Sequence, residues 1–184
     1  IDIGLNALDA FTTANEVVAI GNYAGSAVTT GGYHVLIGYQ AGQMITAGNY
    51  ITHVGYRAGR YNTGAYNTSL GYGALVGVNG SSTGASNVAI GYNALTSITT
   101  GNQNTVMGVS AGRNITTGAN NVIIGRAAGY ASTDVDKAVI IGEQAGYTGN
   151  MTSDADGTVS IGAGAGKNIT SGRYNVSVGF GALA

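Results

Sequence analysis

The chain has no cysteine, no proline and no tryptophan among its 184 residues, and only seven basic and eight acidic side chains. Without cysteine there is no disulfide scaffold, no thiolate metal site and no cysteine nucleophile. Without proline, and with irregular glycine spacing, a collagen helix is excluded. So few basic residues argue against nucleic-acid binding. No apolar run approaches the ~20 residues that a membrane span needs, so we expect no membrane insertion by this segment.

Glycine is what the chain has in excess. It supplies 33 residues, well over twice the usual share of about 7%. Apolar residues make up 44% of the chain and the net charge is −1, which argues against disorder. No window shows a sustained apolar period of 3.6 residues, so the order must come from something other than helices.

An internal repeat explains this composition. An apolar residue followed by glycine recurs eleven times along the chain. Most of the spacings are identical, one is slightly shorter and two are slightly longer. Such self-similarity is typical of stacked repeat architectures. These marker glycines are Gly4, Gly21, Gly38, Gly55, Gly71, Gly91, Gly108, Gly125, Gly142, Gly162 and Gly179.

Positions within each repeat are counted here from its marker glycine. Position −3 is Val or Thr from the second repeat on, position +3 is always Ala, and position +4 is Gly or Leu. A second glycine recurs at position −7, usually after Thr or Ser. The distance between these two glycines does not change, so the longer repeats must differ in the segment after position +4, where a loop absorbs insertions.

We predict an all-β fold, a parallel β-solenoid of about eleven coils of ~17 residues, with residues 1–184 forming a single domain. The Val-x-Ile pattern has period two and predicts a short strand whose first and third side chains point inward. Apolar residues at position −10, such as Val28 and Ile98, predict a second extended piece, so that each coil holds two or three strands. Eleven coils at ~4.8 Å give a rod on the order of 50 Å long.

Two repeats carry a resemblance to known proteins. Asn87-Val-Ala-Ile-Gly-Tyr-Asn-Ala-Leu95 and Asn121-Val-Ile-Ile-Gly-Arg-Ala-Ala-Gly129 resemble the head repeats of YadA-type trimeric autotransporter adhesins, and more closely the longer repeats of phage tail fibres. This resemblance implies a left-handed β-roll, a homotrimer, and an adhesive or receptor-binding shaft. The head family's repeat is typically shorter than the one in this chain. We therefore expect the chain to be a segment of a longer extracellular fibre, on a virion or a bacterial surface.

Tyrosine recurs at two positions that should form columns along the rod. Stacked aromatic residues add roughly 0.2–1 kcal/mol per pair, and flat rings offer platforms for sugars or for a protein partner. The columns are therefore candidate contacts for a cell-surface glycan or protein receptor, although they could equally stiffen the rod or line the trimer interface. The candidates are Tyr39, Tyr56, Tyr72 and Tyr92 at position +1, and Tyr33, Tyr50 and Tyr66 at position −5.

Four aspartates coincide in register. Asp134 and Asp154 lie at position −8, and Asp136 and Asp156 lie at position −6. Neighbouring coils would bring the four carboxylates together, an arrangement that suits Ca²⁺. The alternative is that both segments bulge into water, where Lys137 and screening suffice.

A chain with this pattern offers little for catalysis. His34 and His53 lie at positions −4 and −2 of successive repeats, need not share a face, and belong to no catalytic motif. We therefore predict a non-enzymatic fibre segment that needs no cofactor beyond the possible Ca²⁺. One alternative is a filament subunit that polymerises head to tail. Another is an ice-binding solenoid, although the paired threonines such as Thr99 and Thr100 would point to opposite faces.

Overall fold

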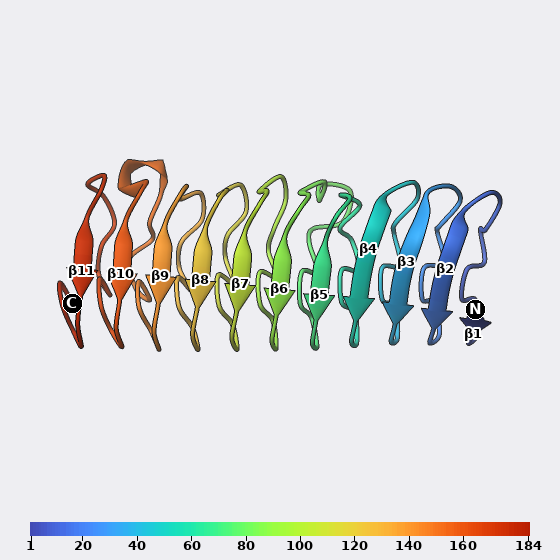
Figure 1. The fold of residues 1–184 in the computed structure, drawn as a ribbon, viewed down its shortest axis with the longest axis horizontal. Helices are drawn as coiled ribbons and strands as arrows, with labels where there is room; N and C mark the ends of the chain where they lie inside the picture. Colours follow the sequence, from blue (N-terminus) through green and yellow to red (C-terminus); the bar gives the residue numbers. More distant parts are fainter.

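The segment before each marker glycine forms a strand, as the repeat predicts. The computed structural model describes residues 1–184, in which eleven strands form one parallel sheet in chain order along a rod (Figure 1). The strands are β1 (Asp2–Ile3), β2 (Asn15–Ile20), β3 (Gly32–Ile37), β4 (Asn49–Val54), β5 (Thr68–Leu70), β6 (Val88–Ile90), β7 (Thr105–Met107), β8 (Val122–Ile124), β9 (Val139–Ile141), β10 (Val159–Ile161) and β11 (Val176–Val178).

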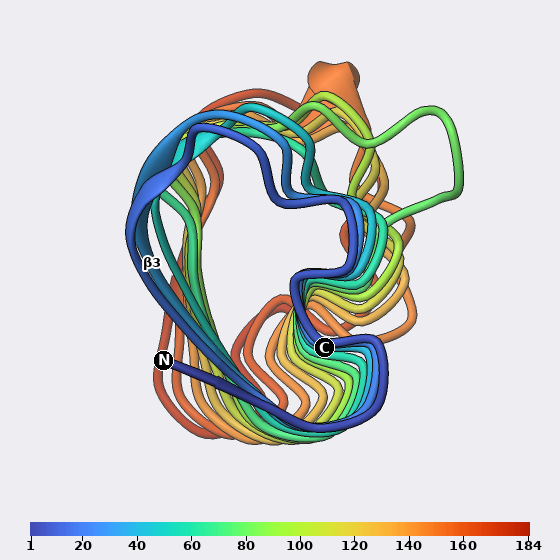
Figure 2. The same ribbon diagram turned by 90° about the vertical axis from the view of Figure 1, so that its right-hand side faces the viewer.

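The strand register follows the marker spacing. Val88 of β6 pairs with Thr105 of β7 across a coil of the usual length, whereas Thr68 of β5 pairs with Val88 across one of the two longer coils. The extra residues leave the sheet undisturbed and lie in a loop near residue 80 and around the short helix η1 (Ser153–Ala155). Both bulge from an otherwise superimposed outline when the rod is seen end on (Figure 2).

Each coil contains one strand and not the two or three that we predicted. The apolar residues at position −10, such as Val28 and Ile98, are fully buried but lie outside any strand. The chain leaves the extended conformation after each strand, with positive φ at the marker glycine and at positions +2 and +4 in most coils. Many backbone groups of these turns still bond to the next coil, for example Thr99 N to Thr116 O.

The expected orientation of the strands is wrong. In β6, Val88 and Ile90 are half-buried and the middle residue, Ala89, is fully buried. The same phase holds in every strand from β2 to β11, so positions −4 and −2 face the interior while −5, −3 and −1 face outward. A parallel strand can be apolar on both faces, and a shift by one residue exchanges the faces. The Val-x-Ile pattern therefore could not reveal which side faces the core.

Alanines at position +3 and apolar residues at positions −2 and −10 fill most of the interior. At position −4, buried asparagines form an amide ladder: the side chain of Asn104 donates to Asn87 Oδ1 at 3.0 Å, and that of Asn121 donates to Asn104 Oδ1 at 2.9 Å. Each ladder member also bonds to backbone groups, for example Asn104 Nδ2 to Gly118 O. The ladder therefore satisfies buried polar groups without a charge.

Candidate functional site: an apolar outer stripe and two tyrosine ladders

Two outward-facing positions of the sheet carry no charge along the whole rod. Positions −3 and −1 hold only Val, Ile, Leu, Met and Thr in all eleven coils, and we call these two columns the outer stripe. Several of its side chains are well exposed, including Leu70 at 50%, Met107 at 43% and Val35 at 36%. Other members of the stripe, such as Val122 and Ile124, are half-buried.

The first tyrosine ladder lies at position −5, next to the outer stripe. The rings of Tyr33 and Tyr50 stack with centroids 4.8 Å apart, and those of Tyr50 and Tyr66 with centroids 5.3 Å apart. All three residues have positive φ and are at least 49% exposed. A bulky residue in this backbone region is uncommon, yet position −5 also has positive φ where it holds Ser86 or Gln103.

The second ladder lies at position +1, just after the marker glycine. Tyr39, Tyr56, Tyr72 and Tyr92 stack in succession, with centroids 4.8–5.2 Å apart and interplanar angles of 10–17°. Tyr23, at position +2 of the preceding coil, meets the Tyr39 ring edge-on. The predicted columns are thus continuous ladders.

Stacking changes what the ladders offer to a ligand. Both faces of each internal ring are covered by neighbouring rings, so the ladder presents ring edges and a row of hydroxyl groups. The flat platforms that we expected for sugar rings are therefore absent at the internal rings, Tyr50, Tyr56 and Tyr72. Only the rings at the ends of a ladder have a face without a stacked neighbour. In the next coil, Ser86 occupies the position of Tyr66 and Val109 occupies that of Tyr92.

Cations lie beside these aromatic rings. The Arg57 guanidinium lies 5.0 Å from the Tyr56 ring centroid, and its Nε donates to Gln40 Oε1. Arg60 lies 4.6 Å from the Tyr61 ring centroid and donates to Gln43 in the same way. These contacts hold both guanidinium groups of this coil on the surface and tie them to the preceding coil.

A third aromatic column, which we did not predict, lies at position +5. The Tyr130 and Tyr147 rings are 5.3 Å apart but tilted by 40°. Arg113 lies over Tyr130 and Lys167 lies over Tyr147. The four residues share one offset from their marker glycines, which is the signal that could have revealed them.

The four aspartates do not form the expected calcium site. No group of three or more acidic or histidine side chains lies close enough to hold a metal ion. Asp136 Oδ1 accepts from Ala119 N at 2.7 Å, and Asp156 Oδ1 accepts from Asp136 N at 2.9 Å. Each carboxylate thus binds a backbone N–H of the preceding coil, as Asn102 does for Ala85. Asp154 is exposed in η1.

Both histidines lie in the interior. His53 Nδ1 is hydrogen bonded to Ser69 Oγ at 2.8 Å, whereas its Nε2 and both ring nitrogens of His34 have no partner. Burial lowers the pKa of His53 to about 3, and burial also lowers that of His34. Both rings are therefore neutral at pH 7. Positions −4 and −2 both face the interior, so the two histidines lie on the same side of the sheet.

The paired threonines serve the structure of the coil. Thr99 Oγ1 donates to Thr116 O at 3.0 Å and Thr116 Oγ1 donates to Thr133 O at 3.2 Å. Thr100 and Thr117, the second members of each pair, are exposed. The first hydroxyl of each pair is therefore engaged by the next coil, and the pair does not present two hydroxyls on one face.

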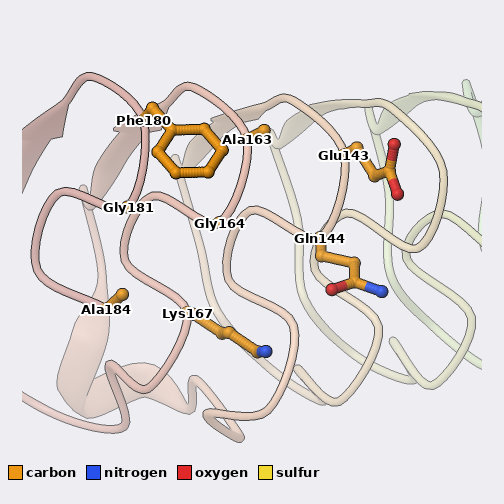
Figure 3. A pocket seen from close by; sticks show the side chains of 8 residues that line it. All are labelled: Glu143, Gln144, Ala163, Gly164, Lys167, Phe180, Gly181 and Ala184. Atoms are coloured by element: carbon orange, nitrogen blue, oxygen red, sulfur yellow. The ribbon is translucent and has the colours of Figure 1, made fainter.

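The C-terminal coils enclose a shallow hollow of about 350 Å³ (Figure 3). Its polar side chains are Glu143, Gln144 and Lys167, and none of them is hydrogen bonded to another. Glu143 instead pairs with Arg126, and both side chains are largely exposed. The hollow therefore brings no acid and base into contact.

The fold contains no helix long and apolar enough to cross a membrane. Comparison of the chain with protein-family models, with curated proteins and with solved structures finds no match to any of them.

Proposed function

We propose that this chain is a non-enzymatic segment of an extracellular attachment fibre on a virion or bacterial surface, assembled laterally with further copies of itself. The observation that supports this most strongly is the outer stripe. Apolar side chains at positions −3 and −1 are not needed to fill the chain's own core, because they point away from it. Parallel sheets are normally covered on both faces, so a partner is expected on this one.

A second copy of the chain is the partner that fits the stripe. The stripe is straight, uncharged and as long as the rod, so another rod of the same kind can cover it from end to end. The resemblance to trimeric adhesin and tail-fibre repeats favours three copies whose stripes face a common axis. The tyrosine ladders come before and after the stripe in each coil, and we propose that their edges and hydroxyl groups contact a cell-surface glycan or protein.

Sedimentation of the chain tests the assembly. We expect the wild type to sediment at three times its mass of 18.2 kDa. Ile124→Lys places a charge in the middle of the stripe and should yield folded monomers, because the side chain already points outward. Thr117→Lys, at an exposed site in the same coil outside the stripe, should leave the assembly intact. A wild type that is folded and monomeric at micromolar concentration would overturn the proposal.

Attachment is tested separately, with labelled protein on whole bacterial cells and on immobilised glycans. Replacing Tyr56 and Tyr72 by Ala removes the middle of one ladder and should lower retention at least tenfold. Tyr174→Ala changes an exposed tyrosine that has no stacked neighbour and should have no effect. Equal retention of all three proteins would show that the ladders are not the contact surface.

A further inference from the structure

Both tyrosine ladders hold phenol rings of neighbouring coils face to face at the surface. We propose that they are sites of oxidative modification, at which hydrogen peroxide and a peroxidase join adjacent coils through dityrosine bonds. The sites are Tyr33, Tyr50 and Tyr66 in one ladder, and Tyr39, Tyr56, Tyr72 and Tyr92 in the other.

The ring geometry supports this assignment. The five stacked contacts have centroid distances of 4.8–5.3 Å and interplanar angles of 8–17°. Near-parallel rings in register place the ortho carbons of one ring against those of the next. The hydroxyl edges face solvent, since these residues are 37–60% exposed. The new carbon–carbon bond lies in the plane of both rings of the product, so coupling requires the two stacked rings to turn their ortho edges toward each other about their side-chain torsions, in coils that already hold them 4.8–5.3 Å apart.

The reaction balances without any group from the protein other than the two phenols. The oxidant removes one electron and one proton from each phenol, which leaves two tyrosyl radicals. Their ortho carbons form a carbon–carbon bond, and the two ortho hydrogens move to the phenol oxygens as the rings regain aromaticity. The two electrons and two protons reduce one molecule of hydrogen peroxide to two of water.

A dityrosine cross-link would stabilise this chain in the way that a disulfide stabilises other proteins. The chain has no cysteine, and its coils are held together by hydrogen bonds and a thin core. Coupled residues such as Tyr50 and Tyr66 are one coil apart, so each bond closes a short loop of the chain. Closing such a loop restricts the unfolded chain, as a disulfide does.

The test is treatment of dilute protein with horseradish peroxidase and hydrogen peroxide, followed by peptide mapping by mass spectrometry. We expect peptides that have lost two hydrogen atoms and join consecutive members of one ladder. A mixture of ¹⁵N-labelled and unlabelled chains separates intrachain from interchain bonds. The proposal is overturned if the bonds are mainly interchain, or if Tyr61 and Tyr174 cross-link as readily as the ladder residues.

A matched pair of variants tests the role of the ladder itself. Tyr50→Phe keeps the ring stack but removes the central phenol, so bonds in that ladder should vanish because Tyr33 and Tyr66 are two coils apart. Bonds between Tyr56 and its neighbours should keep their wild-type yield. Tyr174→Phe, at the same position −5 but without a stacked neighbour, should change neither yield. Persistence of bonds to Tyr33 or Tyr66 in Tyr50→Phe would contradict coupling along the ladder.

Discussion

The two buried histidines, His34 and His53, make the stability of the rod sensitive to single side chains. His53 contacts Ser69 through one nitrogen and Gly59 along its ring, where a Cβ would lie only 2.1 Å away. Apart from His34, no charged or titratable group influences the pKa of His53, so no carboxylate stabilises a protonated His53 ring. Burial therefore keeps both rings neutral, and protonation must accompany local opening.

This environment predicts a loss of stability in acid. Both pKa values are lowered in the fold from about 6.5, so the unfolded chain binds more protons below pH 6.5. Stability should be constant above that pH and should fall as the pH drops toward 3, by about 1.4 kcal/mol per pH unit for His53. Urea unfolding at pH 7.5, 5.5 and 4.5 measures this slope.

His53→Leu separates the histidine contribution from that of the eight carboxylates. The variant places a side chain of similar size at a position where the preceding coil already has buried Leu36. Its stability should fall less steeply than that of the wild type between pH 6.5 and 4.5. Parallel slopes for the two proteins would show that His53 does not resist protonation.

At the scale of the coil, glycine acts through close approach as well as through backbone conformation. A Cβ on Gly108, whose φ is 134°, would lie 2.5 Å from Gly125 O in the next coil. Gly101 has no positive φ, yet a Cβ there would lie 2.4 Å from Gly118 O. Gly108 is thus required by both effects and Gly101 by contact alone.

Two alanine substitutions distinguish these effects. Gly108→Ala meets both the backbone strain and the neighbouring coil, and should lower the free energy of unfolding by more than about 3 kcal/mol. Gly80→Ala keeps the unfavourable φ of 73° but has no atom within 4 Å, and should cost about 1 kcal/mol. Urea titration with circular dichroism measures both. Equal losses would mean that contact between marker glycines contributes nothing.

The sequence was sufficient to predict the strand before each marker glycine, the register of these strands and the tyrosine columns, because a fixed spacing maps directly onto stacked coils. The sequence was insufficient to predict features that depend on the path of the chain within one coil, such as which side of the strand faces the interior. The interior accepts Ala89 and Ser69 as readily as Ile123 at position −2, so polarity did not mark the inner face. We predicted that Asp136 would lie beside other carboxylates. Its carboxylate instead accepts a hydrogen bond from Ala119 N, a contact that the sequence alone could not predict.

The whole rod is not uniformly held together. Each strand contacts only the strands before and after it, so stability adds up from neighbour to neighbour. One apolar cluster runs from Ala7 to Ile51 and a larger one from Ala74 to Ala155. Between them the interior is mainly polar, with His53, Asn62, Asn67 and Ser69 all buried. Hydrogen bonds replace apolar contacts in this junction.

This division predicts that the two clusters open separately. Native-state hydrogen exchange with increasing urea should show three groups of amides, since local opening follows local apolar contact. Strands β4 and β5 in the junction should exchange at the lowest free energy, β2 and β3 next, and β6 to β9 at the highest. Replacing His53 by Leu and Ser69 by Ala, residues that position −2 already accepts in β3 and β6, should raise the protection of β4 relative to β8. A single free energy for all protected amides of the wild type would show instead that the polar junction transmits stability as well as the apolar core does.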